Sequence, residues 1–279
     1  MKWNIVADTS IDLFELEKSY ENISFSTVPF YLTVGDKVFT DDEKLDTEEL
    51  IREMSACKEA STSACPSTGA WLGEFEKEGY AIGITITSGL SGSYNSACAA
   101  KELITEQQPD KKVYVIDTLT TGAESILILR KLCELIDSGL DFDTVIRGVE
   151  AFKNTSRTVF ALCCFDNLVK NGRMSRLKGF VANALGFWGI GIASNIGTIE
   201  MKGIARGQKK AISVIIEDMC QRCGDVKELV LDHCMNEDFA SQVAAAARER
   251  WPEINVTILP TRGLCSYYAE KGGLIIGYC

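Results

Sequence analysis

The amino-acid sequence, 279 residues long, predicts a two-domain α/β protein. Its first domain should hold a parallel sheet, and its second should be α+β with a mixed or antiparallel sheet. Apolar, β-branched runs at Tyr80 to Thr87 and Lys112 to Asp117 are typical of buried parallel strands, and each precedes a helical pattern that would form a crossover. The second half has a different sequence pattern, with Asn and Gly residues typical of a hairpin turn at Ser194 to Thr198. We expect the domains to span residues 1–153 and 154–279.

The N-terminal segment predicts a strand, a turn and a hairpin. Asn4 to Ala7 reads as a strand, a turn follows at Asp8, and a helical pattern begins at Ile11. Phe25 to Val34 and Lys37 to Thr40 flank a Gly-Asp pair, which predicts an antiparallel hairpin.

The helices of the first half are predicted from apolar residues at helical spacing. Asp46-Thr-Glu-Glu is a capping-box pattern that opens the first of them. The predicted helices are Leu50 to Cys57, Ala70 to Lys77, Tyr94 to Thr105, Thr121 to Ser138 and Asp143 to Phe152.

The second half is expected to mix strands with two long helices. A proline at position 252 ends the second helix. The predicted strands are Thr158 to Cys164, Leu229 to Leu231, Asn255 to Leu259 and Leu274 to Tyr278, and the predicted helices are Gln208 to Cys223 and Glu237 to Arg250.

Charge and hydropathy exclude several classes of protein. The net charge of −10 argues against nucleic acid or an anionic membrane surface as the main partner. No apolar run is long enough to span a bilayer, the nearest being the glycine-rich Gly179 to Ala193. The N-terminus reaches Asp8 too early for a signal peptide. We therefore expect a cytoplasmic protein without stable membrane insertion.

The eleven cysteines and the single histidine suggest structure rather than chemistry. The cysteine count is odd and the spacing irregular, so buried thiols are expected, with zinc or thiol redox as a minor alternative around Cys220 and Cys223. His233 follows a strand-like run, where a half-buried structural role is the simple expectation. We expect no metal and no cofactor.

Two Ser/Thr-rich loops are the strongest functional signal. Ser61 to Gly69 and Ser88 to Ser93 each end where a helical pattern starts, and neither contains a charged residue. Hydroxyls, free backbone N–H groups and a helix N-terminus together favour a small anion, and here a carboxylate over a polyphosphate. Helix capping by Ser67, Ser91 or Ser93 is the structural alternative. The presence of both loops in one domain favours the functional interpretation.

Basic residues form a second candidate feature. Arg173 follows a glycine, and Arg206 lies close to Lys209 and Lys210. Each is most simply a solvated surface residue, yet together they suggest a local positive patch for a phosphate or an acidic partner. Asp8 and Asp12 are expected to cap and terminate elements rather than form a catalytic pair.

Six segments match the motifs of one known family in the correct order along nearly the whole chain. They are Asp8 to Leu13 (D-S-T-x-D-L), Val28 to Phe30 leading to Asp41, Thr62 to Ser67 (T-S-x-P-S with one insertion), Thr87 to Ala97 (S-S-x-L-S-G-T-Y-x-S-A), Phe165 to Ser175 (L-x-x-L-x-x-G-G-R-I-S) and Arg206 to Ala211 (R-G-x-K-K-A). By these motifs the chain resembles the DegV family, whose members bind fatty acids.

The resemblance implies a DegV-like fold and one fatty acid per monomer, with the acyl chain sunk between two domains. Thr62 and Ser91 would bind the carboxylate, with Ser63 and Ser93 nearby. Without the insertion in the first loop, Ser63 takes the place of Thr62 as the key hydroxyl.

The resemblance also implies a partner, because bacterial relatives present the carboxylate to a separate fatty acid kinase. Arg173 and Arg206 match family positions near the exposed head group. The chain departs from the family at Cys265, roughly where a histidine is usual, and at Gly186 to Ile192.

Two further interpretations remain open at this point. A serine hydrolase using Ser91 would need a base, and the only histidine lies far along the chain, although a lysine could serve. A nucleotide-binding, kinase-like protein would need a G-x-G-x-x-G or P-loop motif, and the chain has neither. The residues Gly179 to Gly191, with Phe180, Phe187 and Trp188, are candidates for an acyl tunnel, with ordinary core packing as the alternative. We therefore expect a lipid carrier with no catalytic residue of its own.

Overall fold

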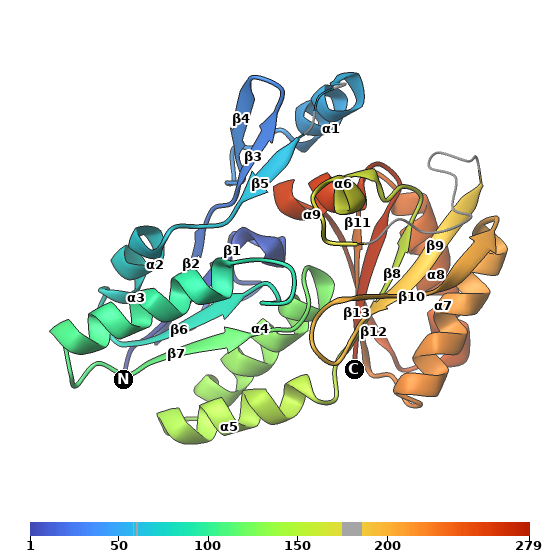
Figure 1. Cartoon of the computed structure of the whole chain (residues 1–279). Helices are drawn as coiled ribbons and strands as arrows, with labels where there is room; N and C mark the ends of the chain where they lie inside the picture. The colour runs from blue at the N-terminus through green and yellow to red at the C-terminus, as the bar shows by residue number, and fades with distance from the viewer. Residues whose placement is uncertain (58, 60, 175–185) are drawn as a thin grey trace.

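The computed structural model describes residues 1–57, 59, 61–174 and 186–279. Its N-terminal half contains a four-stranded sheet in the order β2-β1-β6-β7, in which every pairing is parallel. Figure 1 shows this sheet on the left, with helices on both of its faces. The predicted parallel α/β domain is therefore confirmed. The strands are β1 (Trp3–Asp8), β2 (Ile23–Val28), β6 (Tyr80–Thr85) and β7 (Val113–Asp117).

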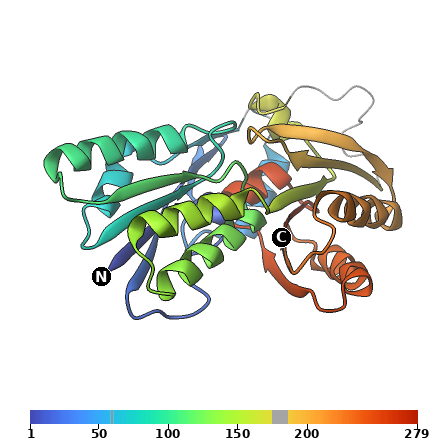
Figure 2. The ribbon, with the colours of Figure 1, turned by 90° about the horizontal axis from the view of Figure 1, so that it is seen from below.

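Helices cover both faces of this sheet because its strands are buried on both sides. The sheet packs on one face against α2 and α3 through Trp71, Phe75 and Ala97, and on the other against α4 and α5 through residues such as Leu129 and Val145. The turned view in Figure 2 shows the same arrangement from below. These helices, all predicted, are α2 (Thr68–Phe75), α3 (Ser93–Gln107), α4 (Ala123–Asp137) and α5 (Phe142–Lys153).

A small antiparallel sheet, in the order β4-β3-β5, stands above the parallel sheet in Figure 1. The predicted hairpin forms it, but Phe25 to Val34 is not one strand. Pro29 separates β2 in the parallel sheet from β3 in the small sheet. The elements are β3 (Tyr31–Val34), β4 (Lys37–Thr40), β5 (Thr62–Ala64) and the helix α1 (Thr47–Ala56), which Asp46 caps as predicted.

The C-terminal half forms a six-stranded sheet in the order β10-β9-β8-β13-β11-β12. All of its pairings are antiparallel except that of β11 with β12, so the predicted mixed sheet is confirmed. Helices α7 and α8 pack on one face. The elements are β8 (Arg157–Leu162), β9 (Phe187–Ala193), β10 (Ile199–Arg206), α7 (Gln208–Arg222), β11 (Glu228–His233), α8 (Glu237–Arg250), β12 (Asn255–Pro260) and β13 (Leu274–Tyr278).

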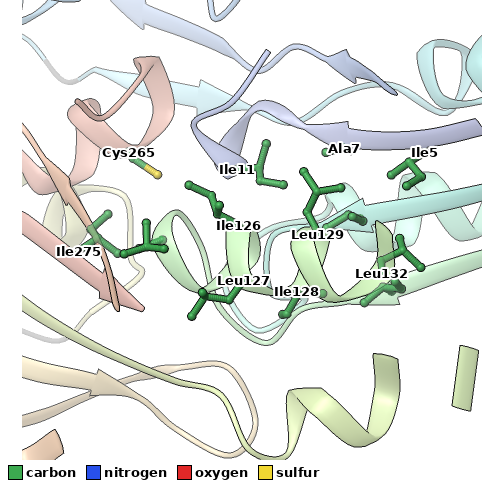
Figure 3. Packing of buried hydrophobic residues seen from close by; sticks show 14 of the residues in the cluster. Ile5, Ala7, Ile11, Ile126, Leu127, Ile128, Leu129, Leu132, Cys265 and Ile275 are labelled. Carbon is green, nitrogen blue, oxygen red and sulfur yellow. The ribbon is translucent and has the colours of Figure 1, made fainter. Parts of the chain in front are cut away.

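Helix α4 joins the two halves because it packs against both large sheets. Ten of its residues are buried, all round the helix. Figure 3 shows Leu132 near Ile5 of β1, and Ile126 between Cys265 and the parallel sheet. The strands of the two large sheets come from either side of residue 153. The exact domain boundary stays a prediction.

Four further elements differ between the sequence-based prediction and the structure. The helix expected from Ile11 is absent. A single 3-10 turn, η1 (Thr9–Ile11), ends at Asp12, whose left-handed backbone (φ 61°) stops a helix. The short helices α6 (Asp166–Lys170) and α9 (Gly263–Ala269), like β5, were not predicted.

The cysteines are less buried than the sequence-based expectation. All eleven cysteines carry free thiols, and four of them are buried while the others are half-buried. Among residues 1–57, 59, 61–174 and 186–279, no group of acidic, histidine and cysteine side chains has the geometry to hold a metal ion. Within the same residues, no helix is long and apolar enough to cross a membrane.

Candidate functional site

A cavity of about 360 Å³ lies where the two domains face each other. Its size is that of a small-molecule pocket, and most of its wall is apolar. The wall takes residues from both domains: Phe30, Ser63, Ala64, Cys65, Ile86, Thr87, Leu90, Ser91, Gly92, Leu119, Thr120 and Thr121 from the first, and Thr158, Phe160, Leu162, Leu168, Arg173, Ile192, Ala193, Gly197, Thr198, Ile199, Leu264, Cys265, Tyr268, Ala269 and Ile275 from the second.

The first Ser/Thr loop contributes Ser63 to this wall, but not Thr62. The loop forms β5, in which successive side chains point to opposite faces. Thr62 is exposed, whereas Ser63 is half-buried and its Oγ lies 2.8 Å from Oη of Tyr268. The structure therefore places the alternative hydroxyl, Ser63, at the pocket.

The second loop contributes Ser91, whereas Ser93 points away from the pocket. Ser91 Oγ accepts a hydrogen bond from the Ser93 N–H group at 3.3 Å. Ser93 is fully buried, and its hydroxyl donates to Asp8 Oδ2 at 2.6 Å. The hydroxyl proton of Ser93 is therefore used in a hydrogen bond inside the domain and does not face the pocket. Gly92 is the N-cap of α3 and has no side chain to cap the helix, so the first turn of α3 begins at the pocket wall without the side-chain cap that α1 has.

Asp8 organises this loop from beneath. Its carboxylate is buried and accepts from the Ile86 N–H group at 3.0 Å as well as from Ser10 and Ser93. Burial raises the pKa of Asp8, and these hydrogen bonds oppose the rise. The prediction that Asp8 caps an element is confirmed, because its side chain caps η1. Its second role, fixing the loop after β6, could not be predicted from sequence spacing.

The two predicted arginines separate. Arg173 lines the pocket, and its Nε donates to the Leu90 carbonyl at 3.2 Å, which links the segment after α6 to the second loop. Arg206 lies on β10, is exposed and stacks over the ring of Phe187 at 5.7 Å. Arg206 does not line the pocket, so the structure brings Ser63, Ser91 and Arg173 together but leaves out Thr62, Ser93 and Arg206.

Helix α9 supplies site residues that the sequence did not predict. Asp41 accepts from the N–H groups of Gly263 and Leu264, both at 2.9 Å, and so caps the helix. The helix thereby places Tyr268 beside Ser63 and puts Cys265 in the wall. Tyr268 was missed because α9 is short and its capping residue lies more than two hundred positions away.

Cys265 offers a neutral thiol rather than a nucleophile. Its Sγ lies 3.4 Å from the Ser10 carbonyl and 3.5 Å from Thr121 Oγ1. Complete burial raises the pKa of Cys265 well above its usual value. The thiol therefore stays protonated and donates a hydrogen bond to the backbone.

Among residues 1–57, 59, 61–174 and 186–279, no histidine or lysine lines the pocket beside Ser91. The single histidine, His233, ends β11, and its Nδ1 accepts from the Asn236 N–H group at 3.3 Å. Burial lowers the pKa of His233. Neither His233 nor a lysine is among the described residues that line the pocket.

Of the predicted tunnel aromatics, neither Phe187 nor Trp188 is among the described residues that line the pocket. Phe180, with the rest of 175–185, lies outside the described residues. Trp188 is buried in the core of the second domain, with its ring centroid 4.3 Å from that of Phe239. Phe187 lies under Arg206. For Trp188 the core-packing alternative is therefore correct, while the pocket wall takes Ile192 and Ala193 from the end of the same strand.

Comparisons with known proteins agree on one family. A family model described as "Uncharacterised protein, DegV family" matches residues 2–279. A DegV domain-containing protein of Streptococcus pneumoniae serotype 4 is 41% identical over 278 residues, which cover 100% of this chain and 99% of that protein.

Two solved structures have the same fold along their whole length. The crystal structure of the Streptococcus pneumoniae Fatty Acid Kinase (Fak) B3 protein, loaded with linoleic acid, has a TM-score of 0.96 at 41% identity and covers 100% of this chain and 99% of its own. A DegV family protein from Eubacterium eligens, loaded with heptadecanoic acid, has a TM-score of 0.93 at 34% identity, with coverages of 99% and 98%.

Proposed function

The chain belongs to the DegV family, and from this premise we propose that it binds a long-chain fatty acid in the pocket between its domains. The observation that carries the proposal is the largely apolar cavity of about 360 Å³ whose wall includes the hydroxyl side chains of Ser63, Ser91 and Tyr268. The fatty acids bound to the Fak B3 and Eubacterium eligens proteins support it.

The head group binds to uncharged donors. Ser63 and Tyr268 share one hydrogen bond, so at least one of their two hydroxyl protons is free to turn toward a carboxylate. Ser91 Oγ accepts from a backbone N–H group, which leaves its own proton available. Charge-assisted hydrogen bonds from such neutral groups hold a carboxylate without burying a fixed cation beside it. Arg173 in the same wall is only half-buried, so its charge stays partly hydrated while it attracts the head group.

The acyl chain binds along the apolar part of the wall. Phe160 and Leu162 of β8, Ile192 of β9 and Ile275 of β13 provide that surface. Transfer of a chain from water gains about 0.8 kcal/mol per buried CH₂ group, hence on the order of 10 kcal/mol for a palmitoyl-sized chain. The chain therefore supplies most of the affinity, while the hydroxyls set the orientation.

Native mass spectrometry of the purified protein tests this function. We expect a co-purifying species of fatty acid mass. Ser63→Ala combined with Ser91→Ala should weaken retention about tenfold or more, because each substitution removes a hydrogen bond to a charged group. Thr62→Val is the matched control, since Thr62 is exposed beside Ser63 but lies outside the wall. Protein that neither carries nor takes up palmitate or oleate would overturn the proposal.

The same site suggests a carrier that works with a kinase. We propose that the chain has no catalysis of its own and presents the bound carboxylate to a separate fatty acid kinase subunit, in the cytoplasm. The similarity to the Fak B3 protein supports this partnership. Arg206, exposed on β10, belongs to the proposed partner surface. Acyl phosphate should form when a kinase subunit, ATP and the loaded protein are combined, and not when the loaded protein is given ATP alone.

A further inference from the structure

The pocket has a second group of polar side chains, toward the Thr158 end of β8. Thr158, Phe160 and Leu162 alternate along β8, so all three face the pocket. Leu162 is at the end of β8 that leads to α6 and Arg173, where the head-group residues lie. Thr158 is four residues away, which corresponds to about 13 Å along a strand. The tail of a bound chain would therefore lie toward Thr158.

A hydrogen-bonded chain of side chains forms this end. Thr120 Oγ1 lies 2.6 Å from Thr158 Oγ1, and both threonines line the pocket. Thr158 Oγ1 donates to Glu124 Oε2 at 2.5 Å, and Ser156 Oγ donates to Glu124 Oε1 at 2.7 Å. Glu124 and Ser156 are buried behind the wall.

Counting protons shows what this end offers to a ligand. With Glu124 ionised, Thr158 gives its proton to Glu124 and accepts the proton of Thr120. Thr120 Oγ1 then keeps a lone pair for a further donor. Burial raises the pKa of Glu124. Once protonated, Glu124 becomes a donor and can free the proton of a neighbouring hydroxyl. The end of the pocket can therefore pair with a ligand oxygen that donates or accepts.

We propose that the Thr120–Thr158 pair is a subsite for a hydroxyl group near the tail of the bound chain, so that the protein accepts hydroxylated long-chain fatty acids. This subsite rests on the proposed fatty acid function. An apolar cavity would reject such a hydroxyl, because burying it without a partner costs several kcal/mol in hydrocarbon transfer. The two threonines remove that penalty. They also satisfy each other when the ligand has no hydroxyl, so an unsubstituted chain still binds.

The test compares pairs of ligands on three proteins. Displacement of a fluorescent fatty acid measures the affinity of each saturated acid, from dodecanoic to octadecanoic, and of its ω-hydroxy counterpart. The proteins are the wild type, Thr120→Val and Thr105→Val. Thr120→Val keeps the shape of the side chain and leaves the Thr158–Glu124 hydrogen bond in place. Thr105→Val makes the same chemical change on the exposed face of α3.

We expect at least one ω-hydroxy acid to bind the wild type as tightly as its parent acid. For that pair, Thr120→Val should weaken the hydroxy acid about tenfold relative to the parent, the value of one well-made hydrogen bond. Thr105→Val should leave the ratio unchanged. A ratio that Thr120→Val does not alter, while the parent acids still bind, would refute the subsite alone. Failure of every parent acid to bind the wild type would refute the proposed function itself.

Discussion

Asp12 and Asp232 place two carboxyl groups in a buried site where the domains meet. Asp12 ends η1 in the first domain, and Asp232 lies on β11 in the second. Asp12 Oδ2 and both Asp232 carboxyl oxygens have no hydrogen-bond partner among the described residues. A Cβ atom at Gly122, the N-cap of α4, would lie 3.0 Å from Asp232 Oδ2 and 3.4 Å from Asp12 Oδ2, so the two oxygens crowd one point. Two carboxylates cannot both ionise there without a large cost.

Burial is the main cause of the perturbed ionisation. Burial raises the pKa of Asp12 to about 8, and the negative charge of Asp41 adds a smaller increase. Hydrogen bonds from the Arg262 N–H group and the Cys265 thiol, together with the positive charge of Arg262, lower the same pKa and offset part of this increase. Burial also raises the pKa of Asp232 well above its usual value. The charge of Asp12 raises it further, and the charge of Arg130 lowers it. At neutral pH the pair therefore holds at least one proton.

Asp12→Asn removes this cost with little change of shape. Asparagine tolerates the left-handed backbone at this position. In the wild type the Arg262 N–H group donates to Asp12 Oδ1 at 2.7 Å, and the side-chain carbonyl of asparagine can accept the same hydrogen bond. Because the pKa rises from 3.8 to about 8, the folded state at pH 7 is destabilised by about 1.4 kcal/mol for each pH unit between 3.8 and 7, hence about 4 kcal/mol. We expect Asp12→Asn to raise the free energy of unfolding at pH 7 by about 2–4 kcal/mol.

The sign of the pH dependence follows from the direction in which the pKa moves. Because the folded pKa of Asp12 is raised, the wild type is unpenalised below pH 3.8. It loses stability as pH rises from there through about 8. Urea denaturation between pH 5 and 8 should show the gap between variant and wild type widening by about 1.4 kcal/mol per pH unit. The exposed Asp110→Asn should show no such widening. A variant less stable than the wild type throughout, or a gap independent of pH, would refute the reasoning.

Two further predictions concern the walls of the pocket. Asp41→Ala removes the hydrogen-bond acceptor of the first two N–H groups of α9, so it should lower stability by about 2 kcal/mol, as thermal unfolding can measure. It should also weaken fatty acid retention in native mass spectrometry, because α9 positions Tyr268. Gly191→Ala would put a Cβ atom 2.3 Å from Cζ of the pocket residue Phe160. The substitution should therefore lower stability by about 1–3 kcal/mol and alter lipid uptake. An unchanged Tm would contradict the close packing of these two residues.

The sequence predicted most elements that depend on local pattern. The runs at Tyr80 and Lys112 became β6 and β7, and the Asn/Gly turn before Thr198 became the β9–β10 hairpin. Such elements are predictable because strand and helix periodicities are written into neighbouring residues. The prediction of a helix from Ile11 was wrong, because the backbone of Asp12 is left-handed and ends the helical turn despite the apolar spacing that follows.

The candidate site was predictable in part. Both Ser/Thr loops do meet at one pocket, as their presence in one domain suggested. Which hydroxyl of each loop faces the pocket could not be predicted, because adjacent residues of a strand point to opposite faces. Thr62 and Ser63 therefore exchange roles with a register shift of one residue.

The sequence by itself determined most of the order of strands and helices, the excess of negative charge and the presence of two hydroxyl-rich loops. Tertiary structure alone decided that Ser63 meets Tyr268 across 205 positions, that Ser93 turns inward to Asp8, and that Asp12 faces Asp232. These pairings join residues far apart in the chain. No local periodicity encodes them. Ser93 reaches Asp8 because β1 and β6 are neighbours in one sheet, and the other two pairings arise where α4 and α9 pack between the two halves.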